Sequence, residues 1–234
     1  MPTDTHPAHT VVVVCAHDEE QSLPSTLAAL AEAFPGARVV LADDASTDAT
    51  AAIATRAGVE VVTAPRNIGK GGAATLAARR ALELAPSPSP AVFVLCDADL
   101  GDTARHLPRL AEVVRSGAAD LAVGAFERRV GGGFGIAVRF AGWAIERRCG
   151  LALRAPISGQ RALSEAALRT ALPFAPRFGM EIGMTVDVAR AGLRVTEVDL
   201  PLAHRPTGRT LRGFVHRGRQ LVDFLQVYAT RRPR

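Results

Sequence analysis

The sequence predicts an α/β fold in which a mostly parallel sheet carries helices on both faces. Short apolar runs at residues 11–15, 38–42 and 59–63 alternate with segments of helical pattern. A fourth run, residues 91–96, is rich in Val and ends at Asp97, as expected of a strand buried on both faces. Because a β-α-β order forms right-handed crossovers, the strands should be parallel and a ligand should bind at their carboxyl ends.

The segments between these runs have helical patterns. In chain order, helices are expected at residues 22–34, at 46–57 with Ser46 as the N-cap and Gly58 as the stop, in an Ala-rich segment that ends near residue 85, and at 103–115. A fifth strand is expected at 120–125, and a later strand-like run ends at Pro201. Both faces of the sheet should therefore be covered by helices.

Composition fits a soluble globular chain, with 48% hydrophobic and 22% charged residues. No apolar run approaches the roughly 18 residues of a membrane span, and the N-terminus lacks the layout of a signal peptide, so a cytoplasmic location is expected. Residues 1–9 should form a flexible tail and residues 10–234 a single domain. The three cysteines, Cys15, Cys96 and Cys149, are widely spaced and are expected to fill the core rather than form disulfides or a zinc site.

Charge is distributed unevenly along the chain. The net charge of +5 is the sum of −2 over residues 1–200 and +7 over residues 201–234. No nucleic-acid partner is expected. Of the 28 basic residues, Lys70 alone is a lysine. A compact ammonium and a planar guanidinium are not interchangeable, so this single lysine indicates a special position, although chance can also leave one lysine in such a chain.

Polar clusters follow four of the predicted strands. They are AHDEE at 16–20, Asp43–Asp44, the loop 66–72 and Asp97–Ala98–Asp99. A parallel sheet brings such strand ends to one edge. Side chains alternate along an extended strand, so Asp97 and Asp99 should point the same way and could hold a hard cation, Mg²⁺ or Mn²⁺.

The same edge is suited to a nucleotide. Asp44 could accept hydrogen bonds from a base or ribose, and the glycines around Lys70 let backbone N–H groups and the ammonium approach phosphate. Taken singly, Asp44 could be an ordinary turn residue, residues 18–20 a solvated helix entry, and the glycines a plain turn. Taken together, they predict a nucleotide-diphosphate site.

Two common nucleotide motifs are absent. In a P-loop, Gly would stand at position 64 and Ser or Thr at position 71, where this chain has Ala64 and Gly71. No G-x-G-x-x-G follows the first strand, which argues against a dinucleotide-binding fold.

Four motifs, in order and spacing, resemble the GT-A glycosyltransferases of family 2: AHDEE at 16–20, LADDASTDAT at 41–50, RNIGKGGA at 66–73 and CDADL at 96–100. The resemblance implies a GT-A (Rossmann-like) fold, a nucleotide-sugar-binding half at 10–125 and an acceptor half at 126–234. It also implies a nucleotide-diphosphate sugar as donor and Mn²⁺ or Mg²⁺ as cofactor. The donor would be held by Ala16, His17, Asp18, Glu19, Asp43, Asp44, Lys70, Asp97, Ala98 and Glu181, and the metal by Asp97, Asp99 and His204.

The acceptor half resembles two kinds of family member. GGG at 131–133, FGMEIGM at 178–184 and VDLPLAHR at 198–205 are similar to glucosyl-3-phosphoglycerate synthases, whereas ISGQRAL at 157–163 is similar to polyprenyl-phosphate glycosyltransferases. The chain departs from each pattern at one place. Phe134 stands where the glucosyl-3-phosphoglycerate synthases have a basic residue, and Ala155–Pro156 stand where the polyprenyl-phosphate enzymes commonly have an acid. Acceptor contacts are expected from Gly132, Gly133, Ser158, Arg161, Arg205 and Arg209.

Several roles have alternatives. Asp99 and Lys70 should offset charge on the leaving diphosphate, and Glu181 should bind sugar hydroxyls or act as a base, unless it is an exposed acid at a helix start. Asp187 is a second candidate base. His204 could equally be structural. Residues 211–228 form an amphipathic pattern that either packs on the core or lies on anionic lipid.

The expected activity is metal-dependent transfer of a hexose, from a donor of UDP-glucose or GDP-mannose type, to a phosphate-bearing acceptor. Polyprenyl phosphate is favoured, with a small soluble acceptor as the alternative. A non-catalytic nucleotide-sugar-binding protein is an alternative of another class, and a sugar nucleotidylyltransferase would need a Gly-rich first loop that is not found here. A peripheral contact with the inner face of the membrane and a homodimer stay open.

Overall fold

The computed structural model describes residues 9–85, 90–126, 135–176 and 179–201. Several predicted functional residues lie outside these ranges, namely Gly132, Gly133, His204, Arg205 and Arg209, as does the predicted helix 211–228. No helix within the described ranges is both long and apolar enough to cross a membrane.

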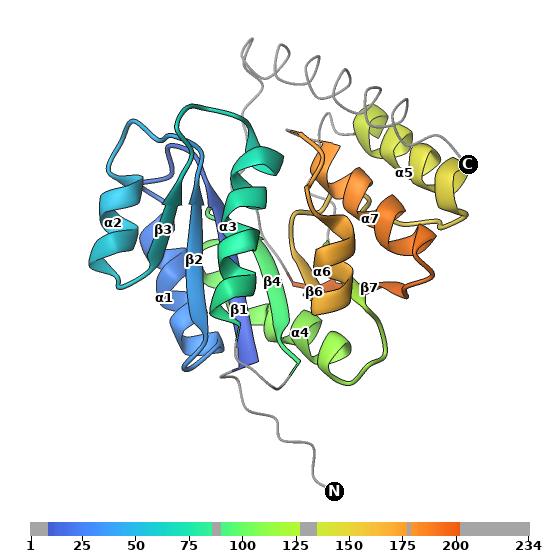
Figure 1. Ribbon diagram of the computed structural model, residues 1–234, viewed down its shortest axis with the longest axis horizontal. Helices are drawn as coiled ribbons and strands as arrows, with labels where there is room; N and C mark the ends of the chain where they lie inside the picture. The colour runs from blue at the N-terminus through green and yellow to red at the C-terminus, as the bar shows by residue number, and fades with distance from the viewer. Residues whose placement is uncertain (1–8, 86–89, 127–134, 177–178, 202–234) are drawn as a thin grey trace, which may run out of the picture.

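Seven strands of the described chain form one sheet in the order β3-β2-β1-β4-β6-β5-β7 (Figure 1). Their bounds are β1 Thr10–Ala16, β2 Arg38–Asp43, β3 Glu60–Thr63, β4 Val92–Asp97, β5 Leu121–Phe126, β6 Arg161–Ser164 and β7 Val195–Leu200. β1 pairs in parallel with β2 and β4, and β6 alone runs antiparallel, between β4 and β5. The predicted mostly parallel α/β fold is confirmed, but strand β6, only four residues long, was not anticipated.

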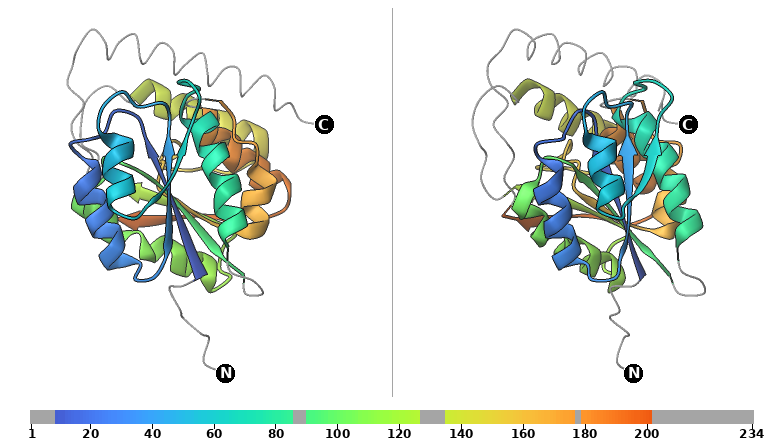
Figure 2. Two further views of the ribbon diagram at one scale, coloured as in Figure 1. Left: turned by 60° about the vertical axis from the view of Figure 1, so that its left-hand side comes forward. Right: turned by 90° about the vertical axis from the view of Figure 1, so that its left-hand side faces the viewer.

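Helices cover both faces of this sheet, as Figure 2 shows for α1 and α3 on opposite sides of the strands. The helices are α1 Leu23–Ala33, α2 Thr50–Arg56, α3 Lys70–Leu84, α4 Pro108–Arg115, α5 Gly135–Cys149, α6 Glu165–Ala171 and α7 Met180–Arg190, with a 3₁₀ segment, η2, at Gly101–His106. Alternate residues of β1 face different layers: Val12 and Val14 pack with α1 and α4, and Val11 and Val13 pack with α3, α6 and α7. Helix α5 packs on the outer side of α7.

Two predicted helix starts were wrong. Helix α2 begins at Thr50 with Ala49 as its N-cap. The hydroxyl of Ser46, expected to cap the helix, instead accepts a hydrogen bond from the backbone N–H of Asp18 at 3.0 Å. The helix expected at 103–115 is divided into η2 and α4, because Pro108 has no N–H with which to continue a helix and is tolerated only in a first turn.

Candidate active site

The carboxyl ends of β1, β2 and β4 lie next to one another and carry the predicted polar clusters (Figure 1). Ala16 pairs with Asp43 across β1 and β2, and Cys15 pairs with Asp97 across β1 and β4. The structure therefore brings the first, second and fourth clusters together at one edge, as the parallel arrangement predicted.

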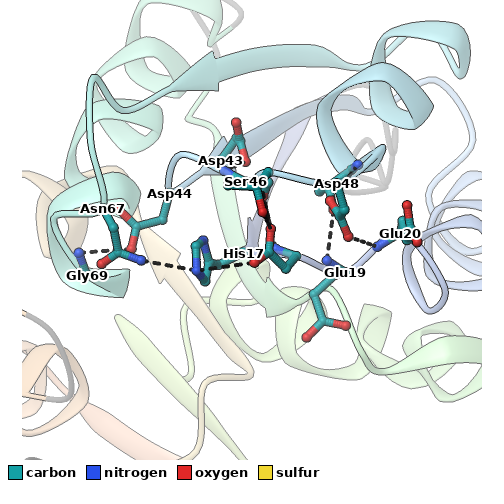
Figure 3. Close-up of polar contacts among 12 residues, drawn as sticks. His17, Glu19, Glu20, Asp43, Asp44, Ser46, Asp48, Asn67 and Gly69 are labelled. Carbon is teal, nitrogen blue, oxygen red and sulfur yellow. Dashed lines mark hydrogen bonds and ion pairs between the residues drawn. The ribbon is translucent and has the colours of Figure 1, made fainter.

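The loops after β1 and β2 are joined by reciprocal hydrogen bonds (Figure 3). Asp18 lies at φ 55°, in the left-handed region, and its carboxylate accepts the backbone N–H of Thr47 at 2.7 Å. The backbone N–H of Glu20 donates to Asp48 at 3.0 Å, and the Glu20 carboxylate accepts the N–H of Ala49 at 3.0 Å. These acids form a rigid frame at the predicted nucleotide edge.

Asp44 anchors the loop that leads to Lys70. Its two carboxylate oxygens accept the backbone N–H groups of Ile68, at 2.7 Å, and Gly69, at 2.9 Å. Gly69 has φ 82°, a conformation that favours glycine, and is the N-cap of α3. Asn67 in the same loop lies 3.2 Å from the ring of His17 (Figure 3). The structure thus gives Asp44 a loop-anchoring role, and its contact with a base or ribose stays a prediction.

Lys70 is the centre of the site. Its Nζ lies 2.6 Å from Asp97 Oδ1 and 2.9 Å from Glu181 Oε1, so residues far apart in the sequence meet at one ammonium. Burial alone would lower the pKa of Lys70, but the two carboxylates outweigh this effect and raise the pKa well above its usual range. Lys70 therefore stays charged at neutral pH. The described contacts use two of the three N–H donors of the ammonium.

Gln160 and Gly159 complete the surroundings of Asp97, and neither was predicted as a site residue. The fully buried Gln160 accepts the backbone N–H of Asp97 at 3.1 Å and donates to Asp97 Oδ2 at 2.9 Å. A Cβ added at Gly159 would lie 2.4 Å from Asp97 Oδ2 and 2.6 Å from Lys70 Nζ, so a larger residue there would displace these side chains. Both residues belong to the ISGQRAL motif, which was the available sequence signal.

Asp99 lies beyond the end of β4, in a turn, rather than in the extended strand that was expected to align it with Asp97. The fully buried Thr26 holds this turn by donating to Ala98 O at 2.7 Å and accepting the N–H of Gly101 at 2.9 Å. Asp99 is partly exposed. A carboxylate in this place suits a hard divalent ion, since such an ion also takes phosphate oxygens as ligands.

The donor set for a metal is incomplete within the described chain. There, no three His, Cys, Asp or Glu side chains are grouped closely enough to hold an ion by themselves. Asp97 contacts Lys70 and Gln160, and the third predicted ligand, His204, lies outside the described residues. The metal role of Asp97 and Asp99 therefore stays a prediction.

Two predicted acceptor residues are buried. Ser158 is 6% exposed, and its hydroxyl accepts the backbone N–H of Gln160 at 3.3 Å. Arg161 is 0% exposed and donates to protein atoms on all sides of its guanidinium. In contrast to the acceptor contact that the sequence suggested, this geometry makes Arg161 an internal support.

The candidate base residues differ in their surroundings. Glu181, in the first turn of α7, is 5% exposed and contacts Lys70, so the alternative of an exposed helix-start acid is wrong. Asp187 lies six residues further along α7 and is not one of the two carboxylates that contact Lys70.

The sheet order and this edge define an α/β protein of the GT-A class. Residues 11–155 match the model of glycosyl transferase family 2. The chain is 33% identical over 221 residues to an undecaprenyl-phosphate mannosyltransferase of Micrococcus luteus, covering 86% of both chains. It is 34% identical over 231 residues to an uncharacterized glycosyltransferase of Mycobacterium tuberculosis, covering 94% of this chain and 97% of that one.

Solved structures of glucosyl-3-phosphoglycerate synthase from M. tuberculosis share the fold. The complex with phosphoglyceric acid has a TM-score of 0.73 and 28% identity, covering 95% of this chain and 79% of that one. The complex with Mn²⁺, UDP-glucose and phosphoglyceric acid has a TM-score of 0.72 and 27% identity, covering 94% and 79%. The chain therefore belongs to glycosyl transferase family 2 and is a glycosyltransferase.

Proposed function

We propose that this glycosyltransferase moves a hexose from a nucleotide-diphosphate sugar to polyprenyl phosphate. The observation that carries the donor half of the proposal is the cluster of Lys70, Asp97 and Glu181 at the carboxyl edge of the sheet. Lys70 has an N–H donor beyond the two that its described contacts use, and this third donor is suited to a diphosphate oxygen. Its charge would stabilise the leaving diphosphate as the bond to the sugar breaks.

Before any ligand binds, the charges of Lys70 and of the three charged residues grouped around it sum to zero. Lys70 and the buried Arg161 supply two positive charges, and Asp97 and Glu181 supply two negative charges. A divalent ion, when bound beside Asp99, would neutralise the donor diphosphate and act as a Lewis acid. Mn²⁺ accompanies UDP-glucose in the related synthase structure, which supports the same cofactor class here.

A phosphate acceptor suits this site because it is already anionic and needs no general base. The relative from M. luteus is named for a polyprenyl phosphate, undecaprenyl phosphate, and is similar to this chain over most of its length. This similarity favours the lipid phosphate. Glu181, held by Lys70, would then contact the transferred sugar rather than remove a proton.

Transfer to a small phosphorylated acceptor is the second candidate. It is supported by the structural neighbours, which were solved with phosphoglyceric acid and with glycerol 3-phosphate. Gln160, Gly159 and Lys70 would serve either acceptor, because their contacts involve the nucleotide-sugar side of the site.

The test is product analysis with radiolabelled GDP-mannose and UDP-glucose in the presence of Mn²⁺. Each donor is supplied either with polyprenyl phosphate or with 3-phosphoglycerate. Label that moves into butanol only when the lipid is present supports the proposal. Label that stays in water, in a product that requires 3-phosphoglycerate, favours the second candidate. Release of free sugar without transfer to either acceptor contradicts both.

A further inference from the structure

The side chain of Arg161 is completely enclosed by protein and joins two segments of the site. Nε donates to Ser158 O at 2.8 Å and Nη2 donates to Pro156 O at 3.1 Å. Nη1 donates to Thr185 Oγ1 on α7 at 2.9 Å. One guanidinium therefore connects the loop before β6 with helix α7.

Both connected segments end at the ammonium of Lys70. On α7, the hydroxyl of Thr185 donates to the backbone carbonyl of Glu181 at 2.9 Å, one helical turn away, and Glu181 contacts Lys70. In the loop, Ser158 directly precedes Gly159, whose backbone packs against the pair formed by Lys70 and Asp97. A shift of Arg161 would thus move Glu181 and the loop relative to Lys70.

A structural role alone accounts poorly for a charge at this position. Burial lowers the pKa of Arg161 to about 10, so the group is still charged at neutral pH, and the atoms that it contacts are carbonyls and a hydroxyl rather than a carboxylate. Apolar side chains of similar volume often serve as well as buried ions, or better, for stability. A planar group with donors in fixed directions is, however, well suited to set the spacing of two backbones.

We propose that Arg161 and Thr185 form a positioning pair that fixes Glu181 and the backbone of residues 158–160 around Lys70. This inference depends on the proposed function in one respect, namely that Lys70 and Glu181 act on the nucleotide sugar. Neither member of the pair touches the nucleotide loops, which lie at the ends of β1 and β2. The pair should therefore govern sugar transfer and leave the binding of the nucleoside unchanged.

The main test compares Thr185→Val with Thr185→Ser. Valine keeps the shape but cannot accept the Arg161 hydrogen bond, whereas serine restores the hydroxyl. We expect Thr185→Val to lower kcat by about tenfold to 10²-fold, because displacement of reacting groups by about 1 Å can have this effect. Affinity for uridine or guanosine, which lack the diphosphate that Lys70 would contact, should stay at the wild-type value when measured by calorimetry, and Thr185→Ser should recover kcat.

A matched control is Thr55→Val. Thr55 makes the same bond to the carbonyl four residues earlier, to Ala51 O at 2.9 Å in α2, but its hydroxyl has no arginine partner among the described residues. This variant should keep wild-type kcat. An equal loss in Thr55→Val, an unchanged kcat in Thr185→Val, or a parallel loss of nucleoside affinity would each overturn the positioning role.

A second measurement does not depend on turnover. Lys70 is the only lysine of the chain, so peptide mass spectrometry can follow its labelling by an amine-reactive reagent without interference from other ε-amines. We expect faster labelling in Thr185→Val and in Arg161→Met than in wild type, because Glu181 no longer holds the ammonium in place. Wild-type labelling rates in folded samples of both variants, as judged by their melting temperatures, would overturn the proposal.

These readouts separate the two hypotheses. Failure of the wild-type chain to transfer sugar to polyprenyl phosphate contradicts the proposed function, whereas the labelling rates of Lys70 still decide whether Arg161 and Thr185 position the cluster.

Discussion

The first half of the chain, predicted to bind the nucleotide, and the second, predicted to bind the acceptor, build their parts of the site in different ways. In the nucleotide half, acidic side chains at strand ends bind backbone N–H groups of neighbouring loops, as Asp44 does with Ile68 and Gly69. In the acceptor half, buried polar side chains reach across elements, as Gln160 does to Asp97. The first half is therefore a frame of loops that bind one another beside neighbouring strand ends, and the second depends on packing against Lys70.

The largest effect should come from the nucleotide half. We expect Asp99→Asn to lower Mn²⁺-dependent turnover by about 10²-fold or more, because it removes a charged oxygen suited to a divalent ion. Steady-state kinetics over a Mn²⁺ series would measure this change, and EDTA should abolish wild-type turnover in the same assay.

Asp102→Asn is the matched control, since Asp102 is exposed nearby and pairs only weakly with Arg105, at 3.4 Å. Its kinetics should equal those of wild type. Undiminished turnover of Asp99→Asn, or full wild-type activity in EDTA, would exclude the metal role of Asp99.

Lys70 joins the halves, and replacing it should have the next largest effect. Lys70→Arg keeps the charge, but the planar guanidinium is larger than an ammonium and must fit beside the Gly159 backbone. We expect kcat to fall by about 10²-fold from misplacement of Asp97 and Glu181. Arg79→Lys, an exposed change on the same helix, should have no effect. Wild-type kinetics in Lys70→Arg would mean that the single lysine is an accident of composition.

The sequence predicted the nucleotide half better than the acceptor half, and the reason is physical. Adjacent strands of a parallel sheet end at the same edge, so the positions of Ala16 beside Asp43 and of Cys15 beside Asp97 follow from parallel pairing. The contacts of Gln160 and Arg161 depend on an antiparallel strand of four residues and on the packing of α7, which leave little periodic signal. From the sequence alone, Arg161 was interpreted as an anion contact, because its burial becomes visible only in the structure.

Gly159→Ala tests how closely the acceptor half packs on the nucleotide half. The added Cβ would clash with Asp97 and Lys70, and overpacking of this kind lowers the free energy of unfolding by about 1–3 kcal/mol. We expect lower stability in urea unfolding together with a lower kcat. Gly142→Ala is the control, because its Cβ would lie at an ordinary 3.8 Å from Leu153 O. Equal stability of the two variants would contradict the close packing.

The smallest effect concerns Cys15 in β1, a thiol whose pKa depends on charged residues of both halves. Burial raises the pKa of Cys15 from 9.0 to about 12; Lys70 opposes this rise, and Asp97, Glu181 and Asp44 add to it. The folded pKa exceeds the unfolded one, so the stabilisation is fully present below pH 9 and is lost as pH rises through 12. Between pH 8 and pH 10 this thiol should remove about 1.4 kcal/mol from the free energy of unfolding.

Urea unfolding at these two pH values, compared between wild type and Cys15→Ala, isolates the contribution of this thiol. Because alanine does not titrate, the variant should lose less stability than wild type on going to the higher pH, whatever its stability at the lower pH. Cys149→Ala is the comparison: burial also raises the pKa of the half-buried Cys149 thiol, but this thiol makes none of these contacts with the Lys70 cluster, so the variant should recover less stability than Cys15→Ala. A loss of stability in Cys15→Ala as large as that in wild type would show that the thiol ionises as readily in the folded protein as in the unfolded chain, and that the two halves do not enclose it.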